Sequence, residues 1–65
     1  MAVTGTSHFV RRADAIEYYR PYGYSTQDVN EKLMAGEIHL GPPPLKRGET
    51  LTTVDDGKRY AVVSP

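Results

Sequence analysis

The C-terminal segment ETLTTVDDGKRYAVV, residues 49–63, is the part of this chain that most restricts its fold. Two runs rich in β-branched and aromatic residues flank the sequence Asp-Asp-Gly, which is typical of a turn. Gly57 suits the left-handed position of a three-residue hairpin loop with a bulge, because glycine takes a positive φ without steric cost. The segment therefore predicts a β-hairpin.

The alternation of side chains sets the expected faces of this hairpin. If Val54 pairs with Lys58, then Leu51 lies opposite Ala61, and both share a face with Val63. We expect that face to be buried. The other face is more apolar than a solvated surface requires, so the hairpin is expected to be covered on both sides or to meet a partner. That other face carries Thr50, Thr52, Tyr60 and Val62.

Two short helices are expected upstream of the hairpin. The sequence RADAIEYYR, residues 12–20, contains good helix formers, and Pro21 predicts that the helix ends at or before the preceding residue. The second helix is expected to begin after Ser25, a good N-cap, with Asp28 at the third helical position as in a capping box. Gly36 is suited to end this helix.

These elements predict an α+β domain in which two short helices, in helix-turn-helix order, pack on the C-terminal β-hairpin. The sequence HFVRR, residues 8–12, predicts a short N-terminal strand at the edge of the sheet, with Phe9 as its anchor. We expect residues 1–7 to form a flexible N-terminus. Residues 8–65 are expected to form a single small domain, because 65 residues provide one core at most.

The composition restricts the setting of the protein. The chain has no cysteine, which excludes a disulfide framework, and no apolar stretch approaches the roughly 20 residues that span a bilayer. The N-terminal sequence lacks the pattern of a signal peptide, so a cytoplasmic protein is expected, in the host cytoplasm if a phage encodes it. Eight Lys and Arg balance eight Asp and Glu, so no overall field attracts nucleic acid or a membrane.

No pattern in the sequence predicts catalysis. The spacing of His8 and His39 matches no metal-ligand motif, and no serine or threonine stands in a nucleophile motif. Asp55 and Asp56 would suit acid–base chemistry, but their place in a turn explains them better, since Asp bonds to nearby backbone amides there. We expect a non-enzymatic protein with no cofactor and no metal.

Tyrosine is the residue type that indicates binding. Tyr18, Tyr19, Tyr22 and Tyr24 fall within seven residues, and Tyr60 stands in the expected hairpin. Tyrosine offers a large contact area at low entropic cost, and clustered tyrosines are typical of recognition surfaces. The alternative is that some of them form a small aromatic core in place of the scarce Leu, Ile and Phe. Both alternatives can hold for different tyrosines.

Basic residues form three doublets, at positions 11–12, 46–47 and 58–59. They would form a phosphate-contacting stripe if the fold gathered them on one side, or else they are solvated ends and strand-edge residues. The doublet 46–47 follows three prolines, residues 42–44, which hold the chain extended as polyproline II does. We expect this loop to set the angle between helix and hairpin and to present the doublet at its rim.

Two features of the sequence resemble a known family. The sequence YYRPYGYSTQDV places Gly23 six residues before Val29, as in helix-turn-helix units. The sequence GEIHLGPPPLKRG, followed by DGKRYAVV, resembles the wing of phage excisionases and related MerR-like winged-helix domains. The resemblance covers residues 13–63 and implies DNA binding. It would place Lys46, Arg47, Lys58 and Arg59 on phosphates and Gln27, Asn30 and Lys32 toward bases.

The charge of the helical region favours a protein partner instead. Residues 13–37 contain five carboxylates and two cations, so this region is repelled by the phosphates that dominate affinity for DNA. We expect a small protein-binding module, of the kind found among phage or mobile-element accessory proteins: an inhibitor, adaptor or assembly subunit. A protein partner or a homo-oligomer is expected and no membrane, with excisionase-like DNA binding as the alternative. The expected partner-binding residues are Tyr18, Tyr22, Tyr24, Tyr60, Lys46 and Arg47.

Overall fold

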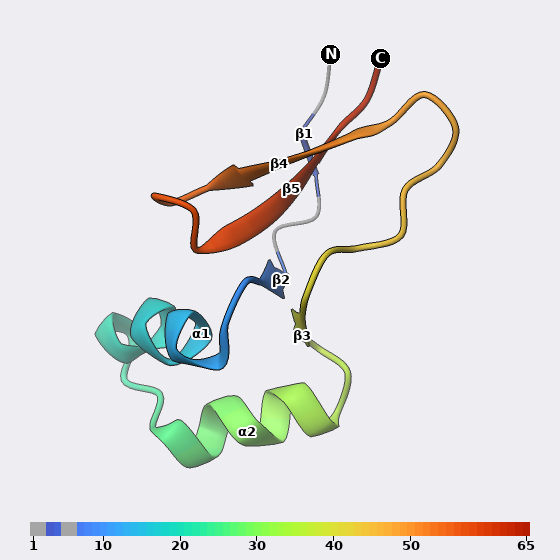
Figure 1. Ribbon diagram of the computed structural model, residues 1–65. Coiled ribbons are helices and arrows are strands. Elements are labelled where there is room, and N and C mark those ends of the chain that lie inside the picture. Colours follow the sequence, from blue (N-terminus) through green and yellow to red (C-terminus); the bar gives the residue numbers. More distant parts are fainter. Residues whose placement is uncertain (1–2, 5–6) are drawn as a thin grey trace.

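The computed structural model describes residues 3–4 and 7–65, and it has the expected α+β architecture (Figure 1). The helices lie at one end of a mixed sheet that includes the C-terminal hairpin. Of the expected flexible segment 1–7, residues 1–2 and 5–6 lie outside the described residues, and residues 3–4 form a strand. In chain order the elements are β1 (Val3–Thr4), β2 (His8–Phe9), α1 (Arg12–Tyr19), the 3-10 turn η1 (Arg20–Tyr22), α2 (Thr26–Met34), β3 (His39–Leu40), β4 (Thr50–Val54) and β5 (Arg59–Val63).

Strand β5 is the centre of the sheet. One edge of β5 pairs with β4 along its whole length. The other edge pairs with β1 at the end of β5 near Val63 and with β2 at the end near Arg59. Strand β3 runs parallel to β2 and continues the sheet beyond it. The expected N-terminal strand therefore exists as β2, but the prediction of an edge position was wrong, because β2 lies between β5 and β3.

The register of the hairpin differs by one residue from the expected one. Val54 lies opposite Arg59, and Leu51 therefore pairs with Val62 and not with Ala61. The expected buried face was wrong for Leu51, which is 38% exposed, whereas Ala61 and Val62 are both buried. Because these two residues are adjacent on β5 and point to opposite faces, β5 is covered on both sides.

Three consecutive left-handed residues account for the longer hairpin loop. Asp55, Asp56 and Gly57 have φ values of 53°, 55° and 80°. The amide of Lys58 donates a hydrogen bond of 3.1 Å to the carbonyl of Val54, which closes the turn. Aspartate tolerates a positive φ better than most residues do. The two aspartates therefore continue the left-handed conformation of the glycine. The loop between the paired residues Val54 and Arg59 has four residues, one more than expected.

Pro21 ends α1 as expected. The α-helical turns stop at Tyr19, and the next residues form the single 3-10 turn η1 with Pro21 inside it. Proline has no amide hydrogen, so the α-helical hydrogen-bond pattern cannot continue through it. The turn closes at Gly23, which has a φ of 87°. The corner between the helices carries Tyr22 and Tyr24.

The expected capping box of α2 is present. The Ser25 hydroxyl accepts a 3.2 Å hydrogen bond from the Asp28 amide, and the Ser25 amide donates one of 2.8 Å to the Asp28 carboxylate. The bond from the Ser25 backbone lowers the pKa of the Asp28 carboxyl. At the other end Gly36 has a φ of 75°, and the Glu37 amide donates to the Lys32 carbonyl at 3.0 Å, as in a Schellman motif.

The core lies where the two helices meet β2. Phe9 and Val29 are its largest fully buried side chains, and Ala15 and Ile38 complete its buried part. Within residues 3–4 and 7–65, neither helix combines the length and the apolar character needed to cross a membrane. The partly buried residues packed against this core are Ile16, Tyr18, Tyr19 and Leu33.

Candidate functional site

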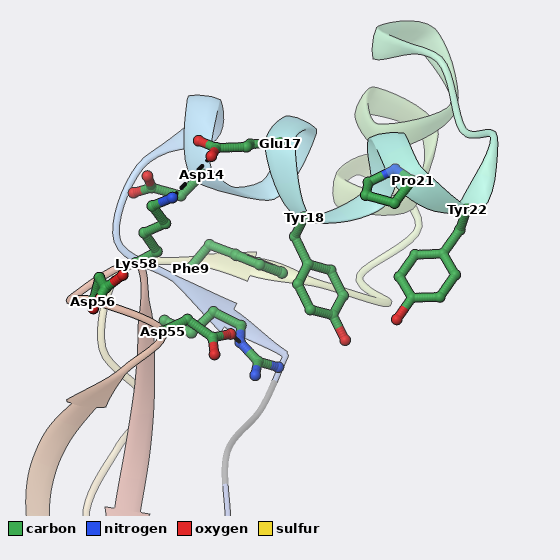
Figure 2. Close-up of a pocket in the computed structure, with 10 residues that line it drawn as sticks. Phe9, Asp14, Glu17, Tyr18, Pro21, Tyr22, Asp55, Asp56 and Lys58 are labelled. Atoms are coloured by element: carbon green, nitrogen blue, oxygen red, sulfur yellow. Dashed lines mark hydrogen bonds and ion pairs between the residues drawn. The ribbon is translucent and has the colours of Figure 1, made fainter.

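A groove of about 410 Å³ lies between α1 and the turn of the β4–β5 hairpin (Figure 2). Its volume falls within the range of ligand and peptide-side-chain pockets, which is roughly 300–1,000 Å³. Phe9 and Asp14 lie on the side of the core, and the remaining lining residues come from two walls. The helical wall contributes Glu17, Tyr18, Pro21 and Tyr22, and the hairpin wall contributes Asp55, Asp56, Lys58 and Arg59.

Aromatic rings lead from the core to the outer part of this groove. The ring centroid of the buried Phe9 lies 5.5 Å from that of Tyr18, and Tyr18 lies 5.9 Å from Tyr22. Both pairs are tilted, a favourable arrangement for aromatic contacts. Tyr22 is 68% exposed. The most exposed ring of the groove is therefore supported by a series of contacts that begins in the core.

A second branch of aromatic residues reaches the opposite side of the corner. The ring of Tyr19 lies 6.0 Å from Phe9, and Tyr24 packs edge-on against Tyr19 at 5.5 Å. The Nζ atom of Lys32 lies 4.8 Å from the centroid of the Tyr24 ring. The same atom donates a 3.3 Å hydrogen bond to the Glu37 carboxylate, and this bond raises the pKa of Lys32. Tyr24 and Lys32 line a separate hollow of about 280 Å³.

The structure divides the tyrosines between the two alternatives. Tyr18 and Tyr19 are half-buried and pack against the core, whereas Tyr22 and Tyr24 are exposed. Tyr60 is half-buried on β5 opposite Thr53 and lines neither hollow. Of the residues expected to bind a partner, the groove therefore brings together Tyr18 and Tyr22, and Tyr24 lies in the second hollow.

Ion pairs fix the hairpin wall of the groove. Lys58 donates a 2.8 Å hydrogen bond from its Nζ atom to the Glu17 carboxylate of α1, which raises the pKa of Lys58 (Figure 2). Arg59 donates from Nε to Asp55 at 2.5 Å, and its guanidinium lies 4.7 Å from the Tyr18 centroid. The two cations of the groove thus bond to carboxylates of the same groove.

Asp14 is a groove residue that the sequence analysis missed. It is 5% exposed and accepts hydrogen bonds from the Nε, Nη2 and backbone amide of Arg11. The bond from the Arg11 side chain lowers the pKa of Asp14. The bond from the Arg11 amide to the Asp14 carboxylate is one half of a capping box at the start of α1. An acidic residue at the third helical position was the signal that would have identified it.

The two basic doublets assigned to DNA contact in the alternative function lie apart from each other. The doublet 46–47 precedes β4, and the doublet 58–59 lies where β5 begins, beside the other end of β4 (Figure 1). The five residues of β4 span about 16 Å. The Asn30 side-chain oxygen accepts a 2.8 Å hydrogen bond from the Nε of Arg12, which joins α2 to α1. Gln27 is exposed on α2.

The two histidines lie together on neighbouring strands. His8 of β2 pairs with His39 of β3, and their rings are stacked with centroids 4.6 Å apart. The Nδ1 of His8 lies 3.3 Å from the carbonyl oxygen of Gly41. In the described part of the chain, no three His, Cys, Asp or Glu side chains are grouped as metal ligands would be. The two rings form a stacking contact between β2 and β3.

No protein family matches the sequence, and neither the curated proteins nor the solved structures contain a significant match. The groove between α1 and the hairpin turn is therefore the feature of this chain that bears on its function.

Proposed function

We propose that the protein is a small non-enzymatic protein-binding module and that the groove between α1 and the hairpin turn is its binding face. The observation that carries this proposal is the position of Tyr22, which is 68% exposed and rests against Tyr18 in the groove. A large side chain that is already supported by its neighbours loses little entropy when a partner covers it. Supported tyrosines of this kind commonly dominate the energy of protein interfaces.

The charges around the groove support a protein partner over a polyanion. Lys58 and Arg59 bond to Glu17 and Asp55, so neither is presented as an unpaired cation to phosphates. An aromatic centre surrounded by polar and charged residues is the common composition of a protein interface. The groove therefore fits a partner that inserts an apolar or aromatic side chain beside Tyr22 and contacts the charged rim.

A pair of photo-crosslinking variants tests this proposal. A photoreactive amino acid at position 22 should crosslink to a specific protein in a lysate of the cells that carry the gene, whereas the same group at position 34 should not. Met34 is the matched control, because it is 88% exposed on α2 and lines neither hollow. The immobilised Tyr22→Ala variant should then lose that protein, and Met34→Ala should retain it. Equal capture by both variants would place the binding face elsewhere.

DNA binding is the second candidate function. The observation that favours it is the order of the elements, since α1, a turn at Gly23 and α2 are followed by the β4–β5 hairpin, as in a winged helix. Lys46 and Arg47 are exposed and form no ion pair with any other residue that the structure describes.

A gel shift with mixed duplex DNA at low salt tests this second candidate. If it holds, the wild type should retard the DNA, added salt should abolish the shift, and the double variant Lys46→Glu/Arg47→Glu should bind more weakly. An absence of retardation at micromolar protein concentration rules it out. The same preparation then serves for the crosslinking experiment, so the two functions are compared on one sample.

A further inference from the structure

The outer edge of β4 is unpaired within the described part of the chain. Strand β4 pairs with β5 alone, and β1 and β2 occupy the opposite edge of β5. The Val54 carbonyl accepts a bond from Lys58, so the backbone polar groups of Val54 point into the hairpin. Because these directions alternate along a strand, Leu51 and Thr53 point their amide and carbonyl groups to the outer edge.

The composition of β4 is unusual for an exposed edge. Its sequence, TLTTV, consists of strand-forming residues with no charge and no proline. Natural sheets normally protect such an edge with lysine, proline, a bulge or a covering segment. Residues 50–53 are all exposed, and Leu51 offers an apolar side chain that is 38% exposed. The edge is therefore a template for the addition of another strand.

The two ends of β4 carry opposite charges, and this selects the added strand. Lys46 and Arg47, both exposed, precede β4 together with Glu49, so residues 46–49 carry a net charge of +1. After β4, Arg59 bonds to Asp55 and Lys58 bonds to Glu17 of α1, and the exposed Asp56 adds a negative charge. In an antiparallel pair related by a two-fold axis, the start of each strand lies beside the end of the other. The basic loop of one copy then meets the acidic turn of the second copy, and this happens twice.

We propose that a second copy of this chain adds to β4, with the two β4 strands antiparallel about a two-fold axis near Leu51. This register places Leu51 beside the same residue of the second copy and directs the outward amides of both strands toward each other. It also brings the loop before β4 of one copy, which turns at residues 46–49, to the side of the turn that follows β4 in the other copy. The proposal does not depend on the groove as a partner-binding face, because strand addition uses the outer edge of β4 and two copies of the chain alone. Asp55 and Asp56 are the residues that the groove and the proposed interface share.

Sedimentation equilibrium over a range of protein concentrations is the first test. At low salt the mass should rise from the 7.2 kDa of the monomer toward twice that value, and added salt should weaken the association. Leu51→Lys should remain monomeric, because a charge on the edge opposes strand addition. Met34→Lys, on α2, should associate like the wild type. Circular dichroism on both variants confirms that the fold is retained. A wild type that stays monomeric at millimolar concentration overturns the proposal.

Charge reversal tests the orientation of the two strands. Lys46→Glu/Arg47→Glu and Asp56→Lys should each associate at least about tenfold more weakly than the wild type, since like charges meet at both ends. An equimolar mixture of the two variants should recover the association, because each interface again joins opposite charges. Failure of the mixture to exceed either variant alone rules out the antiparallel arrangement.

Hydrogen exchange locates the contact. The amides of Leu51 and Thr53 should exchange more slowly as the protein concentration rises, because they gain acceptors in the second copy. The amide of Thr52, which points into the hairpin, should not change. Slower exchange confined to the groove residues would show that the copies associate through another surface, and it would overturn the proposal.

Discussion

The carboxylate of Asp14 accepts hydrogen bonds from the Arg11 side chain at 3.0 and 3.3 Å and from the Arg11 backbone amide at 3.1 Å, while Asp14 itself is 5% exposed. The side-chain bond lowers the pKa of Asp14 and raises that of Arg11. The pair lies at the start of α1, and its member Asp14 lies on the core side of the groove. A change at Asp14 therefore affects both the stability of α1 and the wall of the groove.

This relationship predicts the acid sensitivity of the fold. A carboxyl whose pKa is lower in the folded state contributes stability above its unfolded pKa, about 3.9, and that stability is lost as the pH falls through the folded pKa. Asp14→Asn should be less stable than the wild type at pH 7 and should lose less stability on acidification below pH 4. Thermal unfolding at several pH values measures both effects. Glu31→Gln, at an exposed position of α2, is the matched control and should be as stable as the wild type at pH 7.

The aromatic contacts predict that neighbouring tyrosines differ in their effect on stability. Tyr19→Ala should lower the free energy of unfolding by about 2 kcal/mol, because the ring packs against Phe9 in the core. Tyr22→Ala should change it by less than about 0.5 kcal/mol, because the side chain is mostly exposed. Urea denaturation provides the comparison. A large loss for Tyr22→Ala would mean that this ring stabilises the fold and is not reserved for a partner.

The capping box predicts the effect of a change at the start of α2. Ser25→Ala removes the hydroxyl that accepts a bond from the Asp28 amide and should cost about 1 kcal/mol. Thr26→Ala, one residue further and also exposed, is the control and should cost less than half of that. Equal losses in chemical denaturation would show that the cap does not contribute.

The hairpin turn predicts a ranking of variants at Asp56. This residue has a φ of 55°, where a β-carbon is unfavourable. Asp56→Gly should therefore be more stable than Asp56→Ala by about 1 kcal/mol. The two variants should be compared at low micromolar concentration, so that self-association does not contribute. Equal stability of the two would mean that the turn adopts another conformation in solution.

The helix boundaries followed from the sequence because they depend on local contacts. The Ser25–Asp28 box joins residues three positions apart, and Pro21 excludes a continuous α-helix by its own covalent structure. The register of the hairpin did not follow. The turn sequence is compatible with loops of more than one length, and a change of one residue reverses the faces, so the expected pairing of Leu51 with Ala61 was wrong.

The groove could be predicted only in part. The spacing of Tyr18, Tyr22 and Tyr24 indicated a tyrosine-rich surface, but the hairpin wall comes from a distant part of the chain: Lys58 and Glu17 are 41 residues apart in sequence. No local pattern indicates that these residues meet. They do so because β5 pairs with β2, which leads directly into α1.

The sequence by itself determined two short helices with the caps of the second one, a C-terminal hairpin, a balanced net charge and a surplus of tyrosine, since each depends on composition or on contacts within a few residues. The tertiary structure decided which tyrosines are exposed, that the doublets 46–47 and 58–59 lie at opposite ends of the hairpin, and that the uncharged edge of β4 is left unpaired by the described residues. These outcomes depend on how distant strands pair. That pairing is chosen by the burial of Phe9, Val29 and the two faces of β5, which no local pattern encodes.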